Sequence, residues 1–397
     1  MILIQLFIYM KHSFTIPYKL LCLGWVGIMV AATALPLQAQ RTQPAASVDD
    51  YVYWGSPATY LNNQAKVAYP LIDRMLDAYP PAKEVDKHRQ MALVTLDQFL
   101  HDADYQRRTA FYTFINNRLN RVSDKMDQAM LSGVRIYKLY NSGFILKTKK
   151  TTVAIDLVPG GTTAKPFLTD SALVEIVNRC DALLVTNSDN SHANRAVAKM
   201  FVDLGKQVLA PQGLWTKLGD EVLNVGGDTT QVVKLDKMTV NVLPGHYGNT
   251  SNNIYVIDLL GCGIIAHTGA QDNDNDWAWI DRLHDQYNVD ILLTKSQNTH
   301  LEAMLKGFQP RVVITSHENE MESSVDKRDS YWATQKRLKR LTDLSIPNVI
   351  MTWGETYEYA DSESENISSS ANKVYRDGRI YIERKGTLYT PSGIKVN

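Results

Sequence analysis

Short apolar runs that end in polar residues recur along the chain from Val134 onward. The runs VRIYKLY, GFILKT and TTVAIDL are rich in β-branched residues and are bounded by Gly, Asn, Asp or Lys, which predicts strands separated by turns. Further along, ALLVTN, QVLAP, GIIAHTGA, VDILLT and RVVITS alternate with helical stretches such as SHANRAVAKMFVDLG and THLEAMLKGF. Strands that alternate with helices in this way predict an α/β body.

A helical segment precedes this body. In residues 51–132, the apolar spacing of LIDRMLDAY, MALVTLDQFL and FYTFINNRLNRV is helical, and Pro80 and Pro81 separate two of the helices. Because a three-helix piece of this size would be marginal alone, we expect its apolar stripes to pack on the body. One such stripe consists of Leu93, Leu96, Phe99 and Leu100.

The first 39 residues have the pattern of a secretory signal peptide. A basic start near Lys11 is followed by an apolar middle and a small-residue exit at Ala39, which predicts cleavage there and an exported, periplasmic or secreted protein. Met10 is an alternative start, and an uncleaved membrane anchor is the rival interpretation. If the segment is cleaved, we expect no stable membrane association; residues 40–50 then have the composition of a linker.

Composition narrows the class of partner. The hydrophobic content is 44% with 21% charged residues, which predicts a globular chain, and 42 basic residues balance 42 acidic ones. We therefore expect no nucleic-acid partner. After signal cleavage two cysteines remain, Cys180 and Cys262, and they either pair in an oxidising compartment or stay as buried thiols.

Five of the nine histidines lie at or near predicted strand ends, where functional sites are commonly built. Each has an ordinary structural interpretation, such as a hydrogen bond at a helix start or in a loop. Their order along the chain, however, points to a common site. The five are His192, His246, His267, His300 and His317.

Together with its surroundings, this order resembles the metallo-β-lactamase superfamily over roughly Val134 to Thr352. YNSGFILKTKKTTVAIDL is similar to the two opening strands of that fold, and DALLVTNSDNSH stands in the place of its metal motif, THxHxDH. LPGHYGNTSNNIYVIDL, GIIAHTGAQ and PRVVITSH are similar to later strands. The resemblance implies a four-layer αββα sandwich over residues 133–397, with the helical segment as an N-terminal extension.

Members with intact motifs hold two zinc ions that share a hydroxide, and this sequence departs from their ligand set. His192, His246 and His317 match ligand positions, whereas Asn187 and Asp189 stand at histidine positions. Ser191 stands at an aspartate and Ala270 at the aspartate that bridges both ions. Because a methyl group offers no lone pair and neutral oxygens are weak ligands, a dinuclear centre is not expected.

Two alternatives remain for the metal: one zinc ion or no metal at all. Asp189, His192, His246 and His317 offer one carboxylate and three imidazoles, an ordinary set for one zinc ion. In the family geometry these four residues belong to two separate positions, so sharing one ion requires rearrangement. Asp272 or Glu318 are substitute ligands.

Two functions follow from the resemblance. The first is an exported hydrolase with one metal at most, in which Asp189 is a ligand or the general base and the substrate is unknown. The second is a non-catalytic relative whose cleft binds a small molecule, a glycan or a partner protein. A nucleotide-binding protein of the doubly wound class is disfavoured, because no glycine fingerprint follows an early strand.

Overall fold

The computed structural model describes residues 57–84, 86–130, 132–341, 344–360, 371–376, 379–384 and 387–389. The predicted signal peptide and linker lie outside these residues. By their contacts the residues fall into two units, 1–63 and 64–397, and apart from the start of the first helix every element described below belongs to the second. No described helix is long and apolar enough to cross a membrane.

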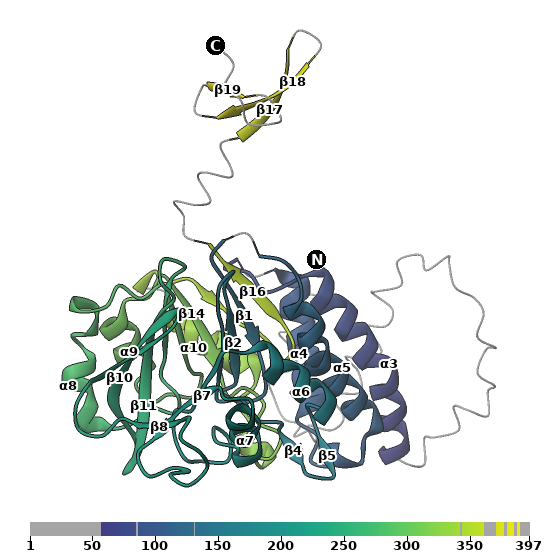
Figure 1. Cartoon of the computed structure of the whole chain (residues 1–397). Helices are drawn as coiled ribbons and strands as arrows, with labels where there is room; N and C mark the ends of the chain where they lie inside the picture. The colour runs from purple at the N-terminus through teal and green to yellow at the C-terminus, as the bar shows by residue number, and fades with distance from the viewer. Residues whose placement is uncertain are drawn as a thin grey trace. The chain divides into compact units, whose positions relative to one another are not determined.

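Two seven-stranded mixed sheets form the centre of the body (Figure 1). The first has the order β16-β1-β2-β3-β6-β7-β8 and the second β15-β14-β13-β12-β11-β10-β9. The strands of the first sheet are β1 (Val134–Lys138), β2 (Phe144–Lys147), β3 (Thr152–Ile155), β6 (Ala182–Leu184), β7 (Gln207–Pro211), β8 (Val222–Val225) and β16 (Thr356–Tyr359). Those of the second are β9 (Gln231–Leu235), β10 (Met238–Tyr247), β11 (Thr250–Asp258), β12 (Ile264–His267), β13 (Ile291–Lys295), β14 (Val312–Ser316) and β15 (Asn348–Val349).

Alternation along each strand sorts side chains between two apolar cores. Ile136 and Phe144 of the first sheet share a core with Val240 and Leu293 of the second, so the two sheets face each other. Residues one position away, such as Tyr137, belong to the other core, which the sheets share with helices. This arrangement is the αββα sandwich that the sequence predicts, and the prediction of fold class is confirmed.

Helices cover the outer faces of both sheets. The helices after β1 are α6 (Asp170–Arg179), α7 (Arg195–Asp203), α8 (Trp277–Ile280), α9 (Leu301–Phe308) and α10 (Tyr331–Arg340). Short 3-10 turns are η4 (Asp274–Asp276), η5 (Leu283–Asp285) and η6 (Val325–Lys327). Ile176 of α6 and Phe201 of α7 lie in the same outer core as Leu183 of the first sheet, and Met304 of α9 lies there with Leu292 of the second.

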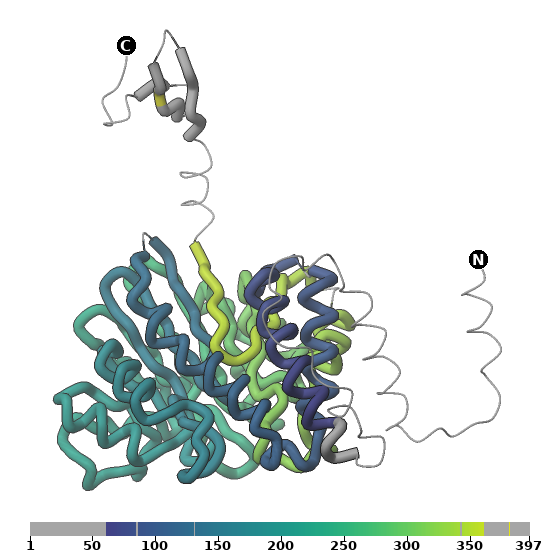
Figure 2. Tube along the Cα trace, turned by 90° about the vertical axis from the view of Figure 1, so that its right-hand side faces the viewer, coloured from purple at the N-terminus to yellow at the C-terminus, as the bar shows by residue number. Residues whose placement is uncertain are grey.

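The N-terminal helices are α3 (Pro57–Ala78), α4 (Lys87–Leu100) and α5 (Thr109–Met126), with the turn η3 (Tyr105–Arg107) between α4 and α5. Leu96 of α4 and Phe111 of α5 are fully buried in the outer core, and Gln90 of α4 donates to Gln335 of α10 at 3.1 Å. Figure 2 shows the tubes of the N-terminal helices, in purple and blue, next to one another at one side of the body.

Two small sheets lie outside the sandwich strands. β4 (Gly161–Thr162) pairs with β5 (Lys165–Pro166), and β17 (Ala371–Arg376), β18 (Arg379–Arg384) and β19 (Thr387–Tyr389) form a three-stranded antiparallel sheet. The last strand of the two sandwich sheets, β16, ends at Tyr359. Cys180 and Cys262 are both free thiols.

Candidate functional site

The strand ends that carry the predicted site residues meet at one edge of the sandwich. β3 leads into Asp156, β6 into Thr186 and His192, and β14 into His317. β3 and β6 run parallel, and so do β12, β13 and β14, so the carboxyl ends within each set lie at the same edge. The rings of His192 and His317 lie 4.9 Å apart between centroids, which joins the two sheets at this point.

His192 is held by a buried carboxylate. Its Nδ1 lies 2.7 Å from Asp156 Oδ2, and the other oxygen of Asp156 accepts from the Thr186 amide at 2.8 Å. Burial raises the pKa of Asp156, but the His192 imidazole and these hydrogen bonds outweigh burial and lower it below its usual value. Asp156 is therefore ionised. A carboxylate at Nδ1 favours the His192 tautomer that carries its proton on Nδ1, and the Nε2 lone pair then points away from Asp156.

His317 is held in the same way by a residue of its own loop. Its Nδ1 contacts the Glu320 carboxylate, and its amide donates to the Asn141 carbonyl at 3.2 Å. Burial lowers the pKa of His317 to about 4, against the opposing effect of Glu320, so the ring is neutral at pH 7. Its Nε2 is buried and has no hydrogen-bond partner among the described residues.

The other two predicted ligands do not join this pair. His246, at the end of β10, has Nδ1 3.1 Å from both oxygens of Asp276, and 40% of its side chain is exposed. Asp189 is exposed, and its backbone amide donates to Asn187 Oδ1 at 3.0 Å. Within the described part of the chain, no three or more His, Cys, Asp or Glu side chains are grouped to hold a metal ion.

A buried amide links two of the positions where the resemblance implies metal ligands. Asn252 Oδ1 accepts from Asn187 Nδ2 at 3.2 Å and from the Ala270 amide at 3.0 Å. Asn252 Nδ2 donates in turn to the Thr268 carbonyl at 2.9 Å, and the side chain is fully buried. Protein groups thus satisfy one another at two positions where the resemblance implies metal ligands.

Sequence reasoning did not single out Asp156, Asn252 or Glu320. Asp156 directly follows the apolar run TTVAI, so its position at a strand end was a signal that could have been used. Nothing in GNTSNN distinguishes Asn252 from its neighbours, because its role depends on contacts with residues far away in the sequence.

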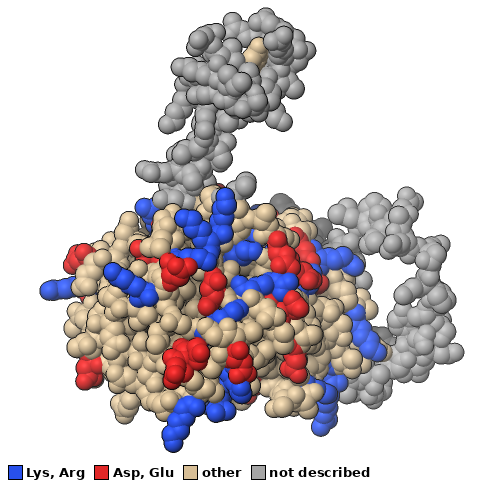
Figure 3. Space-filling model, in the orientation of Figure 1, with Lys and Arg blue, Asp and Glu red and all other residues tan. Residues whose placement is uncertain are grey.

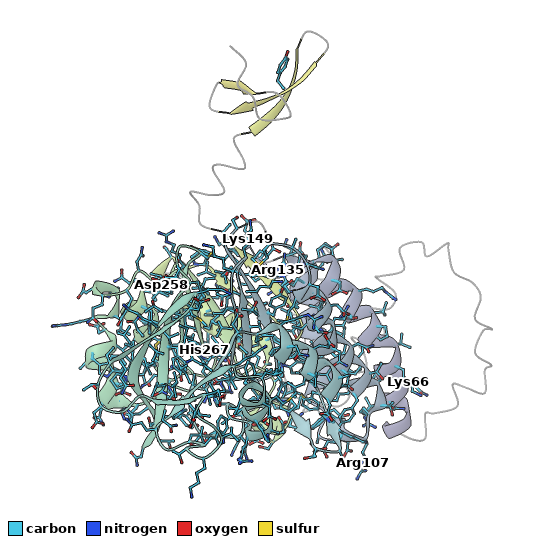
Figure 4. The ribbon with its side chains drawn as sticks, viewed as in Figure 1. Lys66, Arg107, Arg135, Lys149, Asp258 and His267 are labelled. Atoms are coloured by element: carbon cyan, nitrogen blue, oxygen red, sulfur yellow. The ribbon has the colours of Figure 1, made fainter. Side chains whose placement is uncertain are left out.

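His267 is a structural histidine. Its Nε2 donates to the Ser142 carbonyl at 3.0 Å, and its Nδ1 accepts from the Gly269 amide at 3.0 Å. Burial lowers its pKa, and both ring nitrogens are satisfied by the protein. Figure 4 places it inside the body, well away from Asp258 and Lys149 near the other end of the strands.

The donor set does not fit a complete metal centre of the family. A catalytic zinc ion takes three protein ligands, and the neighbouring imidazoles of His192 and His317 supply two. The resemblance implies carboxylates at two further positions, where this chain has Ser191 and Ala270. The two imidazoles nevertheless keep the arrangement typical of metal-binding histidines, with Nδ1 bonded to a carboxylate and Nε2 directed elsewhere.

Comparison with known proteins gives likenesses of fold only. No family model matches the sequence, and no curated protein does. Among solved structures, the chain is similar to Igni18, a metallo hydrolase from Ignicoccus hospitalis, with 16% identity, a TM-score of 0.44 and coverage of 57% of this chain and 99% of that one.

Two further structures are similar at the same level. A possible metal-dependent hydrolase from Veillonella parvula has 12% identity and a TM-score of 0.46 over 58% of this chain and 100% of that one. The metallo-β-lactamase fold protein YhfI from Bacillus subtilis has 11% identity and a TM-score of 0.41 over the same shares. The assignment of the αββα sandwich rests on the strand order and the two cores described above.

Proposed function

We propose that this chain is a non-hydrolytic relative of the metallo-β-lactamase fold, which acts by binding a ligand. The observation that carries the proposal is Asn252, because its amide oxygen accepts from Asn187 Nδ2 and from the Ala270 amide, so that hydrogen bonds within the protein link two positions where the resemblance implies metal ligands. A dinuclear centre needs a bridging carboxylate to hold two cations close together, and Ala270 offers none.

The same proposal covers export and ligand class. The signal-like start supports a periplasmic or secreted protein, without stable membrane association once the signal is removed. Basic and acidic side chains are interspersed over the face shown in Figure 3, and the net charge is zero, which supports a small molecule or a glycan over a nucleic acid.

A hydrolase with one metal ion is the second candidate function. The neighbouring rings of His192 and His317, each oriented by a carboxylate, favour it. Asp189 and His246 would have to move to complete the set, since neither is grouped with the pair. A zinc ion bound there would supply a water of lowered pKa for hydrolysis.

Metal content separates the two candidates. Purified full-length protein, expressed with added zinc, manganese and iron, is analysed by elemental mass spectrometry beside His192→Ala and His317→Ala variants. We expect less than one ion per chain, with no difference among the three proteins and no turnover of ester, phosphodiester or β-lactam substrates. One ion per chain that both variants lose, together with turnover of one of these substrates, would establish the second candidate, and two ions per chain would refute both.

A further inference from the structure

The loop after β14, residues 317–329, is here called the site loop. It carries His317 and Glu320, and its backbone is left-handed at His317, with φ of 67°, and at Asn319, with φ of 49°. Such a conformation is costly for residues other than glycine and persists only where the surroundings impose it. The contacts that hold the site loop therefore decide where the His317 ring lies.

Asp97 of α4 makes the first of these contacts. Its buried carboxylate accepts from Asn319 Nδ2, from the Tyr331 amide and from the Trp332 amide, each at 2.9 Å. One side chain thus joins α4 of the N-terminal segment, the site loop and the start of α10. Asn319 is the residue before Glu320 and lies two positions after His317.

Arg328 makes the second, near the end of the site loop. Its Nη1 donates to the Leu100 carbonyl at 2.6 Å and to the Asp102 carbonyl at 3.1 Å, both in the N-terminal segment. Its remaining nitrogens donate back into the site loop, to the Met321 and Ser323 carbonyls at 3.1 and 3.0 Å. A planar guanidinium can make these contacts together, whereas a lysine ammonium cannot.

The geometry points to the N-terminal helical segment as part of the candidate site. We propose that Asp97 and Arg328 are positioning residues, which hold the site loop so that the His317 ring lies against that of His192. Neither touches the imidazoles, and the proposal is independent of whether the site binds a ligand or a metal. It predicts that changes in α4, far away in the sequence, alter the environment of His317.

The test uses full-length protein with Asp97→Ala, Asp97→Asn and Arg328→Lys, and Asp104→Asn as the control because Asp104 is an exposed acid of the same segment. Two readouts are followed: the imidazole nitrogen resonances of His317 and His192, and amide hydrogen exchange. We expect Asp97→Ala and Arg328→Lys to shift the His317 resonances and to speed exchange of residues 317–322 by about tenfold or more, with strands β2 and β13 unchanged. Asp97→Asn keeps one acceptor oxygen and should give a smaller change, and Asp104→Asn none.

Two results would overturn the proposal. One is unchanged His317 resonances and site-loop exchange in folded Asp97→Ala and Arg328→Lys proteins. The other is faster exchange spread equally over the sheets and the site loop, which would show that these residues stabilise the whole fold and do not position the loop. If Asp97→Ala does not fold, Arg328→Lys and Asp97→Asn decide between the outcomes.

Discussion

Replacing Glu355 tests how the N-terminal helices are bound to the sandwich. Glu355 lies just before β16 and is 4% exposed. Its carboxylate accepts from Arg89 of α4 at 2.8 Å and from the Thr352 amide at 2.8 Å, and it lies 3.3 Å from Arg118 of α5. Glu355→Ala would leave two buried guanidinium groups short of a partner.

The expected loss follows from this burial. Removing one partner of a buried ion pair costs about 3–5 kcal/mol, since the remaining charge stays desolvated. Arg118 keeps a second carboxylate, Asp73, which places the expected loss near the lower end, at about 3 kcal/mol. That is a large share of the roughly 5–15 kcal/mol by which folded proteins are stable.

The assay is urea unfolding followed by circular dichroism, with the free energy taken from midpoint and slope. The matched control is Glu175→Ala, because Glu175 also pairs with an arginine, Arg179, but is 53% exposed on α6. Exposed pairs of this kind contribute about 0–1 kcal/mol. If Glu355→Ala lost no more stability than Glu175→Ala, the buried network would not be what ties the helices to the sandwich.

Three other predictions can be checked separately. Gly354→Ala should destabilise the fold by more than about 2 kcal/mol in the same urea assay, because φ is 73° and a Cβ would overlap the Arg118 carbonyl. Gly205→Ala is the control: its φ is 67° but the space around it is open, so it measures the cost of the backbone conformation without the overlap. Burial lowers the pKa of Lys138 from 10.5 to about 8, so the unfolded state binds more protons than the folded state between these pH values. The stability of the wild type relative to Lys138→Met should therefore rise by about 3 kcal/mol from pH 8 to 10.5. A stability difference that does not change with pH would refute the lowered pKa. Mass spectrometry of the exported protein should show an N-terminus directly after Ala39, and an intact start would favour the membrane anchor.

The fold was accessible from the sequence because strand alternation is a local property. In VRIYK, Ile136 packs between the sheets and Tyr137 packs against helices, as a period of two requires. The same regularity placed His192 and His317 at strand ends, and the structure brings their rings together. Local pattern therefore predicted both the architecture and the edge where the site lies.

The partners of the site residues were not accessible in this way, since they depend on side-chain directions across loops. Within DNDND, Asn273 accepts from the Asn275 amide at 2.9 Å, which is a local contact, whereas the Asp276 carboxylate faces His246, which is far away in the sequence. Glu320, three residues from His317, is paired with it in a loop whose backbone is left-handed at His317. Neither pairing follows from spacing or composition.

Rebuilding the metal site requires more than restoring its ligands, and Asn252 is the reason. The obvious restoration is the fourfold variant Asn187→His, Asp189→His, Ser191→Asp and Ala270→Asp. In that variant the new carboxylate at position 270 would be attached beside Asn252 Oδ1, which accepts from the amide of the same residue at 3.0 Å. Two acceptors side by side repel each other and compete for the same donors, so the carboxylate would turn away from the bridging position.

We therefore expect the fourfold variant to bind fewer than two zinc ions per chain, and the addition of Asn252→Gly to raise its metal content. Elemental analysis of both proteins gives the comparison, and Asn252→Gly alone in the wild-type background should leave metal content unchanged, because it supplies no ligand. Two tightly bound ions in the fourfold variant itself would show that the amide of Asn252 gives way to metal. In that case the lost ligands alone, and not the hydrogen bonds that now link their positions, would separate this chain from a dinuclear hydrolase.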